Sequence, residues 1–306
     1  MWLLFGILTT LSWGAADLFY KKGSDERDGL SHLKIVVAVG FVMGLHAAAY
    51  MVYMWTRGEP FAPSSLVVYL PVSAMYILSM VFGYVGLRYI ELSVSAPVQN
   101  SSGALVALMC FAFLGESVSA FQGAAIALIC VGVFALSVLE KRGADRARLA
   151  AGERPHKKYS VSAVAIIFPL LYCLIDALGT FFDDIWLSDD APKLSEDNAL
   201  VAYELTFLLC AVAAFAYIRF VKKEKLRLRD QRDRGVAALF EVAGQFFYVF
   251  IIGGNGVVVA PLVSAYCVVS MILSRVILKE KLSRAQYAVA GAVVAGIVML
   301  AVAEEL

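Results

Sequence analysis

The chain has 306 residues, of which 61% are hydrophobic and 17% are charged. Soluble domains contain about 45–50% apolar and about 25% charged residues, so a single water-exposed domain of this length could not bury so many apolar side chains. The net charge of +1 excludes the strong basic excess of nucleic-acid-binding domains. The five cysteines lie in apolar stretches and form no CxxC pair, which argues against disulfides and zinc. We expect an integral membrane protein without metal or cofactor.

Ten apolar stretches follow one another along the chain. A helix that crosses a membrane needs about 20 mostly apolar residues. The stretches are residues 2–20, 34–55, 66–87, 93–114, 119–139, 160–182, 199–220, 235–252, 257–278 and 285–303. They are continuously apolar rather than alternating, which favours helices over a transmembrane barrel. We therefore predict an all-α integral membrane fold of ten transmembrane helices.

The basic residues indicate how these spans are oriented. If the spans alternate in direction, 24 of the 26 Lys and Arg fall on one side, and only Arg57 and Lys193 fall on the other. The positive-inside rule makes the basic side cytoplasmic. We therefore expect a multi-pass protein of the cell (inner) membrane with both termini outside the cytoplasm. The predicted outer loop at 183–197 is acidic and includes Asp183 and Asp184.

An internal repeat divides the chain into two halves. The aligned pairs are Ala96-Pro97 with Ala260-Pro261 and Glu116 with Glu280 at a spacing of 164, and Trp13 with Tyr172 and Asp17 with Asp176 at a spacing of 159. Each half contains five spans, so the second half must enter the membrane from the opposite face. We expect two inverted five-helix repeats, at 1–140 and 160–306, joined by a basic cytoplasmic linker at 141–159.

Three segments carry a family resemblance. The first span reads LSWGAADLFYKK, and two later segments read LGESVSAFQGAAIALICVGV and LKEKLSRAQYAVAGAVVAGI. They resemble the Trp-Gly of the first span and the doubled Gly-Glu…Gln…Gly signature of the ten-helix EamA-type members of the drug/metabolite transporter superfamily. The chain departs from that pattern at Lys279, where the signature has glycine, and at Asp17, where a small polar residue is commoner. The resemblance covers nearly the whole chain and implies export or uptake of small metabolites.

The doubled signature also has a structural explanation. Each copy contains a Ser-x-x-Gln segment at the start of a span, and this spacing is that of a capping box. The glutamate that precedes each segment lies near a helix N-terminus, where the helix dipole favours a carboxylate. We expect structural roles for six residues, which are Glu116, Ser119, Gln122, Glu280, Ser283 and Gln286.

Several polar residues within the spans are candidates for substrate binding or coupling. A charge near the bilayer centre costs at least about 2.5–3.5 kcal/mol, so a carboxylate there faces a wet cavity, pairs, binds a proton or snorkels to the interface. Residues 241, 245 and 248 share one helix face, which we expect to face the interior of the bundle. For His46, a packing role and a proton relay both remain open. The candidates are Trp13, Asp17, His46, Asn100, Asp176, Glu204, Glu241, Gln245, Tyr248 and Tyr266.

This combination of residues favours transport. An acidic and aromatic cavity suits a cationic or zwitterionic amine through charge pairing and cation–π contact. The sequence contains no HExxH, GxSxG, Walker A or GxGxxG context, which argues against hydrolysis and nucleotide-driven pumping. We predict a secondary-active transporter of a small polar, amine-bearing solute, with membrane lipids and protons as further partners and no nucleic acid. Two alternatives stay open, a flippase for a lipid-linked solute and a membrane enzyme that acts on lipid with paired carboxylates.

Overall fold

The computed structural model is helical, with no strand in the part of the chain that it describes. That part comprises residues 1–23, 28–86, 98–116, 118–150, 167–188, 194–226, 231–277, 279 and 282–303. The helices of the first half are α1 (Trp2–Gly23), α2 (Ser31–Thr56), α3 (Ser64–Gly86), α5 (Ser102–Met109) and α6 (Ala120–Ala150). A π-helical segment, η1 (Cys110–Leu114), continues α5.

The second half repeats this order of elements. Its helices are α7 (Ile167–Leu187), α8 (Glu196–Ala216) with the π-helical η3 (Tyr217–Val221), α9 (Arg232–Val249), α10 (Gly256–Ser264), α11 (Tyr266–Ile277) and α12 (Arg284–Ala303). The helices α10 and α11 together occupy the ninth predicted span. The predicted all-α membrane fold is confirmed, and each of the ten predicted spans contains a helix. The fourth is shorter than predicted in its described part, where α5 and η1 cover Ser102–Leu114.

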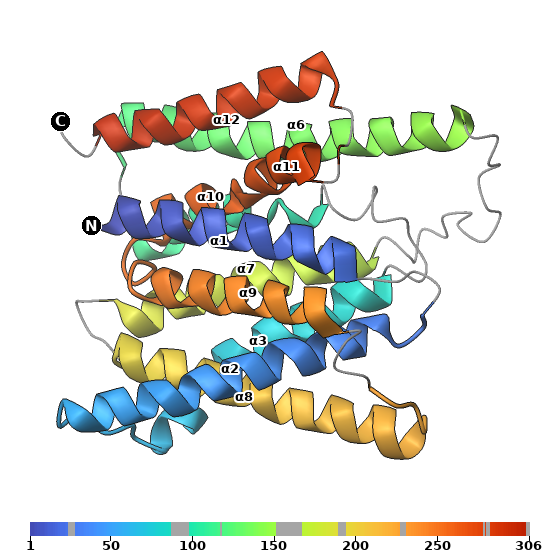
Figure 1. The fold of residues 1–306 in the computed structure, drawn as a ribbon. Coiled ribbons are helices and arrows are strands. Elements are labelled where there is room, and N and C mark those ends of the chain that lie inside the picture. Colours follow the sequence, from blue (N-terminus) through green and yellow to red (C-terminus); the bar gives the residue numbers. More distant parts are fainter. Residues whose placement is uncertain are drawn as a thin grey trace.

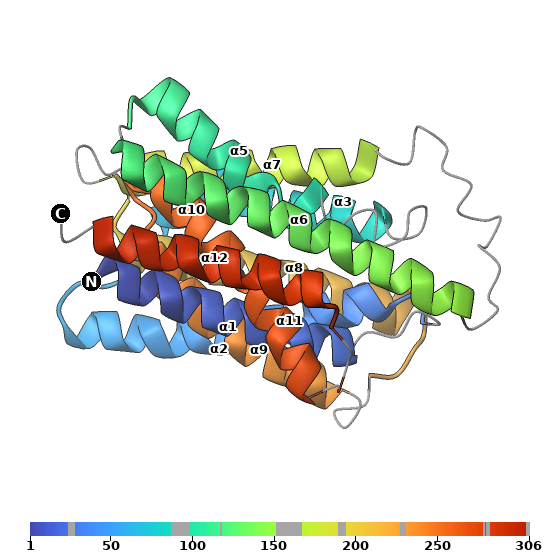
Figure 2. The ribbon, with the colours of Figure 1, turned by 90° about the horizontal axis from the view of Figure 1, so that it is seen from above.

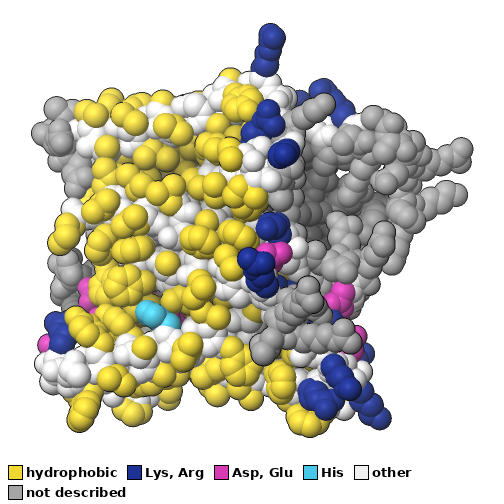
Figure 3. Space-filling model, in the orientation of Figure 1, with side chains coloured by type: hydrophobic (Ala, Val, Ile, Leu, Met, Phe, Trp, Pro, Cys, Tyr) yellow, Lys and Arg dark blue, Asp and Glu magenta, His cyan; other side chains and the backbone are white. Residues whose placement is uncertain are grey.

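The surface of the bundle is suited to lipid. Seven helices of the described residues are long and apolar enough to cross a membrane. The helices α7 and α9 have the length as well, but each carries three or more charged residues. Hydrophobic side chains cover the middle of the molecule, whereas Lys and Arg gather at one end (Figure 3). This division matches an apolar bilayer core with a basic interface.

The helices pack in pairs, and each main pair joins a helix of the first half to a helix of the second. The pair α6 and α12 forms one edge of the bundle and the pair α2 and α8 the other (Figures 1 and 2). Between these edges α5 packs on α10, α1 on α9, and α3 on α7. If α1, α2 and α3 correspond to α7, α8 and α9, the contact of α1 with α9 corresponds to that of α7 with α3. The contact pattern is therefore the same for both halves.

Small residues bring α2 and α8 close together. A Cβ atom placed on Gly40 would lie 2.3 Å from the backbone oxygen of Phe207, and one on Gly44 would lie 2.7 Å from Leu208. Only glycine leaves room for this approach, which is the packing expected of small residues four positions apart in membrane helices.

Two helix ends differ from the prediction. The sixth span was expected to end at residue 182, but α7 continues to Leu187 and buries Asp183 and Asp184 completely. Both carboxyl groups accept hydrogen bonds inside the bundle, which makes their burial tolerable, so they do not belong to an outer loop. The helix α6 continues to Ala150, into the segment predicted as a linker.

Candidate functional site

A cavity of about 330 Å³ lies in the middle of the bundle. Its lining comes from α1, α3, α5, α7, α8, α9, α10 and α11, so both halves of the chain contribute. Eight of the predicted binding or coupling residues line it, and they are Trp13, Asp17, Asn100, Asp176, Glu241, Gln245, Tyr248 and Tyr266. The lining thus brings together residues that are up to 253 positions apart in the sequence, as Trp13 and Tyr266 are.

Three carboxyl groups give the cavity its charge. Asp17 accepts a hydrogen bond from Ser270, and Glu241 accepts one from the hydroxyl of Tyr20 at 3.4 Å. Asp176, on the wall formed by α7, accepts a hydrogen bond from Ser79 at 3.5 Å. No Lys, Arg or His stands among the described residues of the lining. The described lining therefore combines three carboxyl groups with no basic side chain.

Aromatic rings surround these carboxyl groups. The indole of Trp13 packs on Tyr248 with 5.2 Å between the ring centroids. The aromatic lining residues are Trp13, Tyr20, Tyr76, Tyr172, Tyr203, Tyr248 and Tyr266. The faces of such rings attract cations. Four of these tyrosines, at positions 20, 76, 172 and 203, were not among the predicted site residues. Helical spacing contained a signal for two of them, because Tyr20 follows Asp17 by three positions and Tyr172 precedes Asp176 by four, so each shares a face with a carboxyl group.

Two hydrogen-bond donors in the lining have no acceptor among the described residues. They are the indole Nε1 of Trp13 and the amide Nε2 of Gln245, and both atoms are buried. A Cβ atom on Gly244 would lie 2.5 Å from this indole nitrogen, so glycine at that position makes room for the ring. A buried donor without a partner costs free energy, and a solute with an acceptor oxygen would satisfy it.

The other two predicted residues, His46 and Glu204, form a separate pair outside the cavity lining. The Nδ1 atom of His46 lies 2.8 and 2.9 Å from the two carboxylate oxygens of Glu204, which is completely buried. The imidazole also stacks on Tyr50, one turn further along α2. The pair joins α2 to α8 at the edge of the bundle, away from the carboxyl groups of the cavity.

The predicted capping residues lie at helix starts. The amide of Ser119 donates to Oε1 of Gln122, and the amide of Gln122 donates to Oγ of Ser119, at 2.9 and 3.2 Å. Ser283 and Gln286 make the same two bonds at 2.8 and 3.3 Å. These reciprocal bonds satisfy amides that the first turns of α6 and α12 leave free. Glu280 lies outside the described residues.

Glu116 caps a different helix from the one that the sequence indicates. Gly115 has a φ of +69°, a left-handed conformation that turns the chain away from η1. Oε2 of Glu116 then accepts a hydrogen bond at 3.1 Å from the amide of Val257, in the first turn of α10 rather than α6. The reason is tertiary, because the turn after η1 brings the carboxylate to the N-terminus of a helix in the other half.

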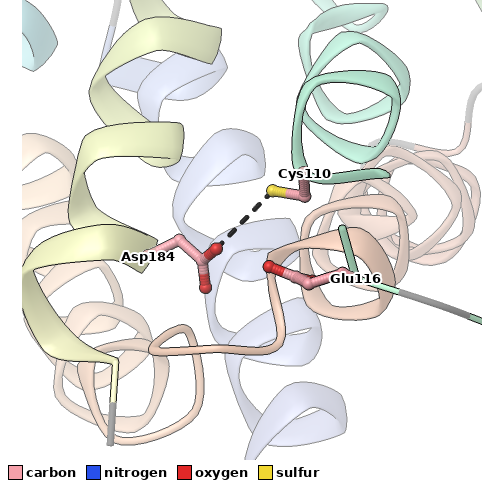
Figure 4. A group of neighbouring side chains, drawn as sticks. All are labelled: Cys110, Glu116 and Asp184. Atoms are coloured by element: carbon pink, nitrogen blue, oxygen red, sulfur yellow. Dashed lines mark hydrogen bonds between the residues drawn. The ribbon is translucent and has the colours of Figure 1, made fainter. Parts of the chain in front are cut away.

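Asp184 caps the same helix. Its Oδ1 accepts hydrogen bonds from the amides of Asn255 and Gly256 at 3.0 and 3.1 Å, and the thiol of Cys110 donates to Oδ2 at 3.6 Å (Figure 4). The ligand atoms of Cys110, Glu116 and Asp184 lie within 4.8 Å of one another, a spacing that suits a metal ion. Two of the oxygens already accept backbone amides, and the positive end of a helix disfavours a cation. We therefore assign this group to the capping of α10.

An ion-pair cluster ties helices together at the basic end. The Lys34 ammonium lies 2.7 Å from Asp28 and 2.8 Å from Glu224, which connects the start of α2 with the segments before it and after η3. Burial opposes ionisation of Asp28, but hydrogen bonds from Lys34 and from the amide of Leu30 outweigh it and hold the pKa of this carboxyl group below its usual range.

Comparison with known proteins identifies the family. The model of the EamA-like transporter family matches residues 1–138 and again residues 160–302. A solved crystal structure, described only as that of a protein, matches with a TM-score of 0.71 over 97% of this chain and 96% of that chain. The two chains are 14% identical, so this likeness shows the fold alone. No curated protein matches significantly. The chain belongs to the EamA-like transporter family and is a membrane transporter of the drug/metabolite superfamily.

Proposed function

We propose that this transporter carries a small, amine-bearing polar solute that binds in the central cavity as a cation or zwitterion. The observation that supports it is the lining, which combines Asp17, Asp176 and Glu241 with seven aromatic rings and has no basic residue in its described part. Carboxylates and ring faces both attract an ammonium group, and they do so more strongly in a cavity that excludes bulk water. The described lining offers an anionic solute no cationic side chain to balance its charge.

The solute also carries a hydrogen-bond acceptor. The free donors of Trp13 and Gln245 lie on the walls formed by α1 and α9, where Asp17 and Glu241 also stand. An oxygen bound to these donors would place the ammonium group of the same molecule near a carboxyl group. A hydroxyl, carbonyl or carboxylate oxygen would serve, so an amino alcohol or an amino acid fits better than a simple alkylamine.

Transport proceeds by secondary coupling between two inverted halves. In support, the family model matches the chain twice, and α1 and α7 run in opposite directions along the bundle (Figure 1). We place the inverted repeats at 1–140 and 160–306, with the cavity between them. The clustering of Lys and Arg at one end supports a cytoplasmic location for that end and extracytoplasmic termini (Figure 3).

Protons are the coupling ion in this proposal. Asp17 and Glu241 lie on adjacent packed helices, α1 and α9, and both face the cavity. Two nearby carboxyl groups raise the cost of ionising both, so one of them holds a proton until a cation arrives. Entry of an ammonium group then replaces that proton, and the exchange couples solute movement to the proton gradient.

A thermal-shift experiment on the purified chain in detergent tests the substrate class. The probes are n-butylamine, n-butanol and 4-aminobutanoate, which differ in charge and in the acceptor oxygen. A ligand present at 100 times its Kd stabilises the folded state by about 2.7 kcal/mol. We expect stabilisation in the order 4-aminobutanoate, n-butylamine, n-butanol. Equal effects of the amine and the alcohol would refute the proposed role of charge.

Matched variants assign the effect to the cavity. Glu241→Gln removes a cavity carboxylate, and Glu204→Gln makes the same change at a membrane glutamate outside the lining. Each variant is compared with its own ligand-free state, so differences in basal stability cancel. We expect Glu241→Gln to abolish the amine shift and Glu204→Gln to retain it. The opposite result would place the binding site elsewhere.

A further inference from the structure

We propose that Asp183 is a second proton-binding site of the transport cycle, outside the cavity and connected to it by the hydroxyl groups of Tyr76 and Tyr248. The inference rests on the proton coupling of the proposed function and extends it to a residue that takes no part in solute binding. It also assigns a role to a buried carboxyl group that neither lines the cavity nor caps α10.

Among the described residues, the hydrogen-bond donors to Asp183 are neutral hydroxyl groups. Its side chain is completely buried in α7 and does not line the cavity. The hydroxyl of Tyr69 donates to Oδ1 at 2.6 Å, and the hydroxyl of Tyr76 donates to Oδ2 at 3.4 Å, both from α3. Tyr203 of α8 and Tyr248 of α9 face the same carboxyl group.

No described Lys, Arg or His forms an ion pair or hydrogen bond with Asp183. A carboxyl group without a cationic partner changes its charge by binding and releasing a proton, because an isolated buried charge is costly. Asp184, the next residue, has backbone amides of α10 as partners and is capped by them. The two adjacent carboxyl groups thus have different surroundings, because Asp184 accepts backbone amides and lies beside Glu116, whereas the described partners of Asp183 are side-chain hydroxyl groups.

A short chain of hydroxyl groups leads from Asp183 to the cavity. The hydroxyl of Tyr76 lies 3.1 Å from Oγ1 of Thr180 and 3.2 Å from the hydroxyl of Tyr248. All three of these residues line the cavity, whereas Asp183 and Tyr69 do not. Tyr76 is therefore the contact between the buried carboxyl group and the space that the solute occupies.

Proton movement along this chain is balanced. The carboxylic acid of Asp183 gives its proton to the oxygen of Tyr76 while the proton of the Tyr76 hydroxyl passes to the oxygen of Tyr248. The hydroxyl proton of Tyr248 passes to water in the cavity, and each tyrosine ends with the number of protons it had. The result is an ionised Asp183 and one proton in the cavity, and the reverse sequence reloads the carboxyl group.

The chain offers a matched pair of substitutions to test this connection. Tyr69→Phe and Tyr76→Phe each remove one hydroxyl that donates to Asp183. Only Tyr76 also contacts the cavity, and Tyr69 makes the shorter bond. A purely structural Asp183 would be disturbed at least as much by Tyr69→Phe, whereas a relay would be broken by Tyr76→Phe alone.

The experiment is infrared spectroscopy of the full chain in lipid nanodiscs, without a ligand. The C=O stretching band of protonated Asp183 is identified as the band that Asp183→Asn removes. We expect this band to decrease reversibly when the pH of the medium is raised, and to shift in D₂O. Tyr76→Phe should slow its exchange about tenfold, the equivalent of one lost hydrogen bond, and Tyr69→Phe should leave the rate within about twofold.

Each of three results would overturn the inference. One is a carboxyl group at position 183 whose band does not respond to the pH of the medium. A second is equal slowing of exchange by the two tyrosine substitutions. If Asp183→Asn does not fold, the band is identified as the one that shifts in both tyrosine variants, because both remove a hydrogen bond to this carboxyl group. A further arm with n-butylamine separates this inference from the proposed function. If the amine binds but the band and proton release are unchanged, Asp183 is no coupling site and the cavity assignment stands.

Discussion

The pair of His46 and Glu204 should stabilise the fold and leave solute binding untouched. The perturbation is His46→Phe, which retains an aromatic ring against Tyr50 and Phe246 and removes the nitrogen that contacts the carboxylate. Glu204 is completely buried, and among the described residues His46 is its hydrogen-bond partner, so a phenyl ring at position 46 removes that partner from the carboxyl group.

The magnitude follows from the geometry of the pair. Opposite unit charges 2.8 Å apart attract by about 6 kcal/mol at an effective dielectric constant of about 20, and the desolvation of both groups offsets much of it. Removal of one partner from a buried pair costs about 3–5 kcal/mol because the other charge stays buried, whereas replacement of both by apolar groups is close to neutral. We therefore expect a large loss for His46→Phe and recovery in the double variant His46→Phe, Glu204→Leu.

The assay is equilibrium unfolding in mixed micelles, with SDS as the denaturant and helicity as the signal. The free energies of the parent, the two single variants and the double variant complete a double-mutant cycle, and n-butylamine binding is measured on each protein. If His46→Phe unfolds at the same SDS fraction as the parent, the pair contributes no stability. If it remains stable but loses binding, the histidine acts in transport, as the relay interpretation holds.

Four further outcomes are expected. Gly40→Ala should destabilise the chain by about 1–3 kcal/mol in the same assay, because its Cβ would lie 2.3 Å from a carbonyl oxygen of α8, whereas Gly291→Ala, with no atom nearby, should not. Ser119→Ala and Ser283→Ala should each cost about 0.5–2 kcal/mol without altering the ranking of solutes, and a changed ranking would contradict a capping role. The lowered pKa of Asp28 contributes stability that is present above its unfolded value of about 3.9 and lost as the pH falls below it, so Asp28→Asn should flatten the acid limb of the unfolding curve. A C-terminal alkaline phosphatase fusion should be active and a C-terminal fluorescent protein dark, and the reverse would place the termini in the cytoplasm.

Helical spacing and the cost of buried charge were sufficient to find much of the cavity. Asp17, Glu241 and Gln245 stood out because a polar residue in an apolar span needs an internal partner, and the structure places all three in the lining. Helical spacing and buried charge do not distinguish Glu204 from these three residues. Its place outside the cavity depends on the pairing of α2 with α8, which the sequence pattern of one helix does not contain.

Asp183 was missed for a different reason. The dense acidic segment after residue 182 reads as a loop, but the carboxyl group is buried in α7 and satisfied by tyrosines of α3. A signal was present, because Asp176, Thr180 and Asp183 follow the spacing i, i+4, i+7 of one helix face. Glu116 carried no such signal, since its partner on α10 is 141 residues away.

The proposed selection of the solute by charge in the cavity of Asp17, Asp176 and Glu241 can be tested by one efflux measurement, without knowledge of the natural substrate. Sealed liposomes that contain the purified transporter are loaded with an equimolar mixture of amino acids, amino alcohols, polyols and dicarboxylates. Mass spectrometry of the medium then identifies which solutes leave unchanged. We predict that amine-bearing solutes leave through the parent and the Glu204→Gln variant but not through Glu241→Gln. Efflux of polyols or dicarboxylates in preference to amines would show that the carboxyl groups of the cavity do not select the solute by charge.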